Sequence, residues 1–125
     1  MNYSNSEIFK GIDLSDSFVL FWKNEDDKLV FELEASIWSE SSYYEKPKED
    51  EHTCYKKARL EFKKIISIQG LLEMHQVNPS IDRNGDIDYG NIDELHLEDT
   101  SFKLNGDFGN VTIIGGELSF EINET

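Results

Sequence analysis

The feature that most constrains this fold is a strict alternation of side chains over residues 28–38. One set of alternate positions is entirely apolar: Leu29, Phe31, Leu33, Ala35 and Ile37. The other set is mostly polar: Val30, Glu32, Glu34, Ser36 and Trp38. Because successive side chains of a β-strand point to opposite faces, this period of two predicts a strand with one buried face.

Other segments in the first half of the chain carry similar strand signals. Residues 17–22 are bulky, and the turn-forming residues 24–27 connect them to residues 28–38. A connection this short cannot make a parallel crossover, so the two segments predict an antiparallel hairpin. Residues 53–62 alternate again, and residues 64–70 add a second apolar run. This pattern fits either one bent strand or two separate strands.

Turn signals divide the second half of the chain. The pairs Asn105-Gly106 and Gly115-Gly116 are both typical of two-residue hairpin turns. Between residues 92 and 97 the apolar positions fall out of phase, because Ile92 does not alternate with Leu95 and Leu97. We still expect a strand there.

These patterns predict one all-β domain over residues 1–125, an antiparallel sandwich or barrel of about seven or eight short strands with little helix. We expect residues 1–11 to form either a loosely ordered segment or a short helical turn. Helix content should stay below roughly 15%, whereas typical globular domains contain about a third.

The charge of the chain excludes some partners. The net charge is −14, of which residues 82–125 carry −9. Nucleic acids and anionic membranes both need surface cations, so we expect neither as a partner. Five of the 12 bases cluster at Lys56, Lys57, Arg59, Lys63 and Lys64. We expect them to form a basic strand edge that pairs with acidic neighbours.

Three observations favour a cytoplasmic location. No apolar run reaches the ~20 residues of a membrane-spanning helix. The first 15 residues are polar and acidic, which is not the pattern of a secretory signal. Cys54 is the single cysteine, so the chain cannot form an internal disulfide.

The loop of residues 82–93 is the strongest metal candidate in the sequence. It offers oxygen ligands at spaced positions: Asp82, Asn84, Asp86, Asp88 and Asp93. Calcium takes six to eight such oxygens, but the usual loop has its glycine at the sixth position and a bidentate Glu at the twelfth. Here Gly85 comes fourth and Asp93 comes twelfth. We therefore predict a tight turn at Asn84-Gly85 without a tight calcium site, and keep calcium or small-ligand binding as an alternative function.

No other arrangement of residues predicts chemistry. His52 and Cys54 are spaced to share one face of a strand, but no second ligand pair of the zinc type accompanies them. A buried Cys54 acting as a small apolar residue is the favoured interpretation. We find no nucleophile elbow, cysteine-protease signature or phosphate-binding loop. The sequence thus predicts no cofactor and no catalytic residue, with an enzyme of unrecognised type as a remaining alternative.

Aromatic residues gather around the first three predicted strands: Trp22, Trp38, Tyr43, Tyr44 and Tyr55. Trp38 falls on the polar side of its strand, together with Glu32 and Glu34. Exposed Trp and Tyr beside acidic groups are typical of partner-binding surfaces. The other interpretation is a second buried face of the sheet.

Several fragments together resemble a family of short uncharacterised bacterial proteins: residues 11–18 (Gly-Ile-Asp-Leu-Ser-Asp-Ser-Phe), Cys54-Tyr55, Asp88-Tyr89-Gly90, Gly106-Asp107-Phe108-Gly109 and Gly115-Gly116-Glu117-Leu118. The resemblance covers most of the chain and implies no functional residue. In general character the chain is also similar to the immunity proteins of bacterial toxin systems.

The sequence favours a non-enzymatic acidic interaction protein, of immunity type in one interpretation, that binds a basic protein partner. The residues expected at the partner surface are acidic and aromatic: Asp86, Asp88, Asp93, Glu94, Trp38, Tyr43 and Tyr44. Long-range attraction would speed the encounter, and buried aromatic groups would hold the complex. The oligomeric state is left open.

Overall fold

The protein is an antiparallel β-structure. The computed structural model describes residues 2–49, 51 and 53–123. Strands hold 62% of this structure and helices 7%, which confirms the all-β class and the low helix content. The helices are three short 3-10 turns: η1 (Tyr3–Asn5), η2 (Glu7–Phe9) and η3 (Met74–Gln76). The first two confirm the helical alternative for the N-terminal segment.

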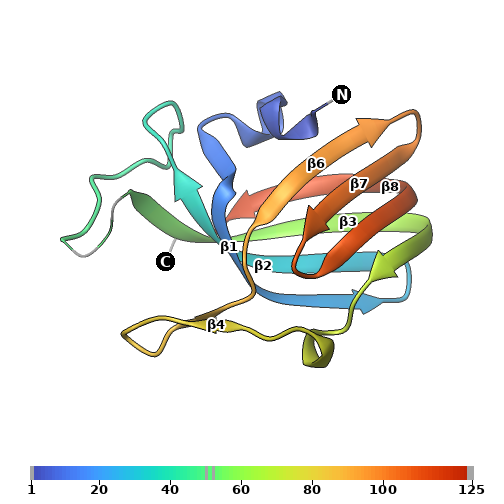
Figure 1. The fold of residues 1–125 in the computed structure, drawn as a ribbon. Helices are drawn as coiled ribbons and strands as arrows, with labels where there is room; N and C mark the ends of the chain where they lie inside the picture. The colour runs from blue at the N-terminus through green and yellow to red at the C-terminus, as the bar shows by residue number, and fades with distance from the viewer. Residues whose placement is uncertain (1, 50, 52, 124–125) are drawn as a thin grey trace.

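Six strands form one sheet in the order β1-β2-β3-β8-β7-β6. Their bounds are β1 (Ile12–Glu25), β2 (Lys28–Ile37), β3 (Cys54–Leu71), β6 (Ile92–Glu98), β7 (Ser101–Gly106) and β8 (Gly109–Ile122). The short strands β4 (Ser80–Ile81) and β5 (Ile87–Asp88) form a separate hairpin. Figure 1 shows the sheet curling, with the N-terminal turns at one side and the β4–β5 hairpin at the other.

The curl brings the two edge strands together at one point. The Val19 N–H donates to the Gly90 carbonyl at 2.8 Å, and the Tyr89 N–H donates to the Val19 carbonyl at 2.7 Å. These bonds fasten β1 to the segment that leads into β6. The sheet therefore wraps around its own apolar face, which becomes the core.

The core is built from the faces that the alternation predicts. All five apolar positions of β2 are fully buried: Leu29, Phe31, Leu33, Ala35 and Ile37. In β3 the apolar members of one alternating set are buried too: Cys54, Ala58, Leu60 and Phe62. Trp22 is also buried, and its indole N–H donates to the Leu72 carbonyl at 2.8 Å. The predicted β1–β2 hairpin is confirmed, with Glu25 opposite Lys28.

The question of one or two strands after residue 53 has a clear answer. β3 is a single strand that bends, because its register against β8 shifts between Ile65 and Ser67. Lys64 there has φ 58°, an uncommon value for a residue with a side chain. The bulge bends the strand and increases its twist, which helps the sheet to curl.

Two predicted turns differ from the structure. Gly115-Gly116 is not a turn: both residues lie inside β8, opposite the bulge of β3, and their positive φ values allow β8 to follow the bend. The β7–β8 hairpin is real, but Gly106 pairs with Gly109, so Asp107 and Phe108 form the turn instead of Asn105-Gly106. Phe108 is fully buried, which anchors this turn to the core.

Candidate functional site

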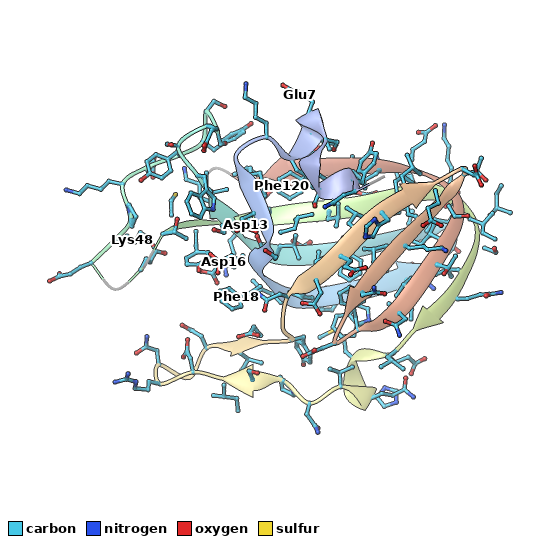
Figure 2. The ribbon with its side chains drawn as sticks, turned by 45° about the horizontal axis from the view of Figure 1, so that its top comes forward. Glu7, Asp13, Asp16, Phe18, Lys48 and Phe120 are labelled. Atoms are coloured by element: carbon cyan, nitrogen blue, oxygen red, sulfur yellow. The ribbon has the colours of Figure 1, made fainter. Side chains whose placement is uncertain are left out.

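A cleft of about 650 Å³ opens where the two edge strands of the curled sheet diverge. Its walls come from the start of β1, the start of β6 and the N-terminal turns, with Trp38 and Glu40 beyond the end of β2. Figure 2 shows Glu7 on the N-terminal turns and Asp13 on the nearby part of β1. Segments from three parts of the sequence thus meet around one hollow.

The floor and the rim of the cleft differ in chemistry. Four of the lining side chains are buried apolar groups: Phe9, Leu14, Ile92 and Leu95. Around them stand five acidic residues: Glu7, Asp13, Glu40, Asp93 and Glu94. Lys10 is the one basic residue among the described lining residues. An apolar centre inside a polar rim is the usual arrangement of a protein-binding surface.

A bulge in β6 creates the acidic side of this rim. The register against β7 shifts between Ile92 and Glu94, so that Ile92 and Leu95 both point into the core. Asp93 and Glu94 are then both exposed between them. The bulge also explains why Ile92 is out of phase in the sequence pattern. It places two predicted partner residues side by side at the cleft.

The opposite side of the rim also depends on an irregular strand. β1 pairs regularly with β2 at Asp13, then loses register until Phe18. The buried Ser17 hydroxyl bridges the gap: it donates to the Asp13 carbonyl at 2.7 Å and accepts from the Ser36 N–H at 2.9 Å. Asp13 in turn accepts from the Ser15 N–H at 3.1 Å. This bulge fixes the backbone that carries Asp13 and Leu14 into the cleft.

The acids of the cleft are poorly neutralised. Glu94 lies 3.3 Å from the ring of His96 and accepts from the Asn105 side-chain amide at 3.1 Å. Within the described chain, Glu7, Glu40 and Asp93 form no ion pair. The cleft is therefore a region of negative potential with exposed carboxylates.

The basic cluster lies elsewhere, on β3. This strand lies between β2 and β8, so the predicted basic strand edge is wrong, but four of its five cations pair with acidic neighbours as expected. Arg59 and Lys57 of β3 stand directly opposite Glu32 and Glu34 of β2. The Arg59 Nε is 3.2 Å from a Glu32 oxygen, and the Lys57 Nζ is 3.8 Å from a Glu34 oxygen. Two further pairs join Lys56 to Glu45 and Lys64 to Glu117. Among the described residues, these cations pair with acids of the sheet and loops and not with those of the cleft.

The structure exposes the predicted aromatic residues. Trp38 is 49% exposed and lines the cleft, whereas Tyr43 and Tyr44 are 38% and 40% exposed. Tyr43 lines a neighbouring hollow that shares Lys10, Ile12 and Glu40 with the cleft. Tyr44 lines another hollow that shares Asp13, Ser15 and Trp38 with it. All three predicted aromatic residues therefore surround one part of the surface.

Asp86 and Asp88 do not join this group. They belong to the β4–β5 hairpin, which Figure 1 places across the sheet from the N-terminal turns. A turn is present at Asn84-Gly85, as predicted: Asp82 Oδ1 accepts from the N–H groups of Asn84 and Asp86 at 2.8 and 2.9 Å. One oxygen of Asp82 is thus engaged by the backbone, as is one oxygen of Asp88, which accepts from the Gly90 N–H at 2.8 Å.

The calcium candidates are also divided between the hairpin and the cleft, because Asp93 lies on β6. Among the described residues, no group of three or more His, Cys, Asp or Glu side chains is placed to hold a metal ion. His52 lies outside the described residues. Cys54 is buried at the start of β3.

A second polar cluster lies on the outer side of the β1 bulge. Asp16 Oδ2 accepts from the Ser36 hydroxyl at 3.0 Å and from the Tyr55 hydroxyl at 3.3 Å. Burial raises the pKa of the Tyr55 phenol well above its usual value, and the negative charge of Asp16 and its hydrogen bond raise it further. Tyr55 therefore stays protonated and acts as a hydrogen-bond donor.

Sequence reasoning missed part of the cleft. Glu7, Asp13, Glu40 and the apolar floor residues Phe9 and Leu14 carry no local pattern that marks a site. Only the folded chain brings them together with Asp93 and Trp38.

No family model, curated protein or solved structure matches this chain. In the part of the chain that the structure describes, no helix is long and apolar enough to cross a membrane. The cleft itself, with its apolar floor, acidic rim and exposed Trp38, is the feature that supports a functional assignment.

Proposed function

We propose that this domain is a non-enzymatic interaction protein, of immunity type, whose acidic cleft binds a basic protein partner. The observation that carries the proposal is the cleft rim, where five carboxylates and one lysine surround a buried apolar floor. Acidic groups at a rim speed the encounter with a cationic partner. The apolar floor and Trp38 supply contact area and an aromatic face for a lysine or arginine side chain.

This proposal keeps only some of the residues that the sequence predicts at the partner surface. Asp93, Glu94 and Trp38 belong to the cleft, and Tyr43 and Tyr44 extend the same surface. Asp86 and Asp88 do not line it, so they contribute only through long-range charge. Salt shortens the reach of such charge to about 10 Å at 0.1 M, so their effect on a small ligand should be weak.

The test uses a short arginine-rich peptide as the probe. We expect it to change the fluorescence of Trp38, and this change should disappear in Trp38→Phe, because Trp22 is buried in the core. Binding should weaken steeply as salt is raised, mainly through slower association. A glutamate-containing peptide of the same length should not bind.

Two double variants with the same change in net charge locate the site. Asp93→Asn with Glu94→Gln should weaken the peptide roughly two- to thirtyfold, since each of the two exposed charges contributes about 0.2–1 kcal/mol. Asp86→Asn with Asp88→Asn should leave the affinity within about twofold. Equal effects of the two double variants, or a peptide that binds without altering Trp38, would contradict the cleft as the binding site.

A further inference from the structure

The cleft is bordered by two strand edges that have no neighbouring strand. Among the described strands, β1 pairs with β2 alone and β6 pairs with β7 alone, so these are the outer strands of the sheet. The outer edge of such a strand presents unpaired backbone N–H and C=O groups. An exposed edge of this kind can accept an additional strand.

In the described part of the chain, backbone contacts connect the outer edges of β1 and β6 to other segments at the two ends of the cleft. At one end, Val19 bonds to Tyr89 and Gly90. At the other end, Asn2 forms a β-bridge with His96 of β6. Between these points, β1 residues 12–15 and β6 residues 92–95 both line the cleft. Among the described residues, no backbone hydrogen bond joins these two stretches.

We infer that the partner contributes an extended basic segment, which adds as a strand to the open edge of β6 inside the cleft. This inference rests on the proposed function of the cleft. About four residues fit along residues 92–95, a length of ~13 Å at 3.3 Å per residue. Because the rim of the cleft is acidic, charge complementarity favours a basic segment as its occupant.

The side chains of an added strand would alternate between two environments. One set faces the apolar floor at Leu14 and Ile92, and the other set faces the carboxylates of Asp93 and Glu94. The sequence that fits best therefore alternates apolar residues with arginine or lysine. Main-chain hydrogen bonds would supply affinity, and the alternating pockets would supply specificity.

A pair of peptides separates strand addition from charge attraction. The first is a short peptide of alternating arginine and valine. The second has the same sequence with every interior backbone nitrogen methylated. Methylation preserves the charge of the peptide but removes the N–H donors that it needs to pair as a strand. We expect the methylated peptide to bind at least about tenfold more weakly, since each net hydrogen bond contributes about 1 kcal/mol.

Amide hydrogen exchange gives the second readout. The unmodified peptide should slow exchange in residues 92–95, and the methylated peptide should not. Equal affinities of the two peptides, or unchanged exchange in residues 92–95, would overturn strand addition while leaving the acidic cleft as the binding site. If neither peptide binds or alters Trp38, both strand addition and the proposed function are wrong.

Discussion

At the scale of single residues, Ser17 shows how one hydroxyl holds the site together. The hydroxyl replaces ladder bonds that the β1 bulge removes: its O–H donates to the Asp13 carbonyl, and its oxygen accepts from the Ser36 N–H. Ser17→Ala leaves a buried N–H and a carbonyl without partners, so we expect a loss of about 1–3 kcal/mol in the free energy of unfolding. Ser15→Ala removes an exposed hydroxyl that donates to Asp13 Oδ1 at 2.6 Å, and it should cost less than about 0.5 kcal/mol because this bond is open to solvent. Urea denaturation of both variants measures the difference, and similar losses would contradict this role.

Tyr55 makes stability depend on pH in the alkaline range. Its raised pKa means that the folded protein holds the phenolic proton more tightly than the unfolded chain does. The resulting stabilisation is complete below the usual pKa near 10 and is lost as pH rises towards the folded-state value. Tyr55→Phe loses the hydrogen bond to Asp16, so it should be less stable than the wild type at pH 8 by about 1 kcal/mol. It should also lose less stability above pH 10, because it has no phenolic proton to release. Denaturation at several pH values tests this, and parallel pH profiles would refute it.

At the scale of elements, two glycines separate the cost of a positive φ from the cost of a steric clash when each is replaced by alanine. Gly70 ends the bent part of β3 with φ 88°, and a Cβ there would overlap the backbone carbonyl of Asn110. Gly85 has nearly the same φ, 84°, but no atom lies within 4 Å of its Cβ position. We expect Gly70→Ala to cost about 2–4 kcal/mol and Gly85→Ala about 1 kcal/mol. Equal shifts in thermal midpoint would show that the crowding at Gly70 is unimportant.

Strands were easier to predict from the sequence than the places where they bend. The alternation in β2 identified its buried face, because period two directly reflects which side chains point inward. Gly115-Gly116 was wrongly assigned to a turn, because a glycine pair serves a bulge as readily as a hairpin. Ile92 falls out of the alternating pattern because β6 also has a bulge, between Ile92 and Glu94. Bulges shift the register by one or two residues, and a single sequence shows such a shift only as a broken pattern.

At the scale of the whole molecule, the cleft could be predicted only in part. Asp93, Glu94 and Trp38 were identified from charge and alternation, but Trp38 and Asp93 are far apart in sequence. The curl of the sheet brings them together, and that curl depends on bulges and on the Val19–Gly90 contact. Glu7 and Glu40 join the site for the same reason. No local pattern records which distant segments meet.

The unpaired acids of the cleft also imply a conflict between binding and stability. Their mutual repulsion opposes folding, since the chain already carries −14. Asp93→Asn with Glu40→Gln should therefore raise the free energy of unfolding by a few tenths of a kcal/mol, while weakening the arginine-rich peptide. Glu32→Gln is the control, because it breaks the pair with Arg59 and should lower stability slightly or leave it unchanged.

Salt provides the independent check of this conflict. Raising salt from 0.1 to 1 M shortens the screening length from about 10 to 3 Å. A salt that acts mainly by screening, such as sodium chloride, should therefore stabilise the wild type. The gain should be smaller in Asp93→Asn with Glu40→Gln, because part of the repulsion is already removed. Two outcomes would contradict the conflict between binding and stability. One is a double variant that is less stable than the wild type at low salt, and the other is a double variant whose stability rises as much with salt. In either case the carboxylates of the cleft do not destabilise the fold.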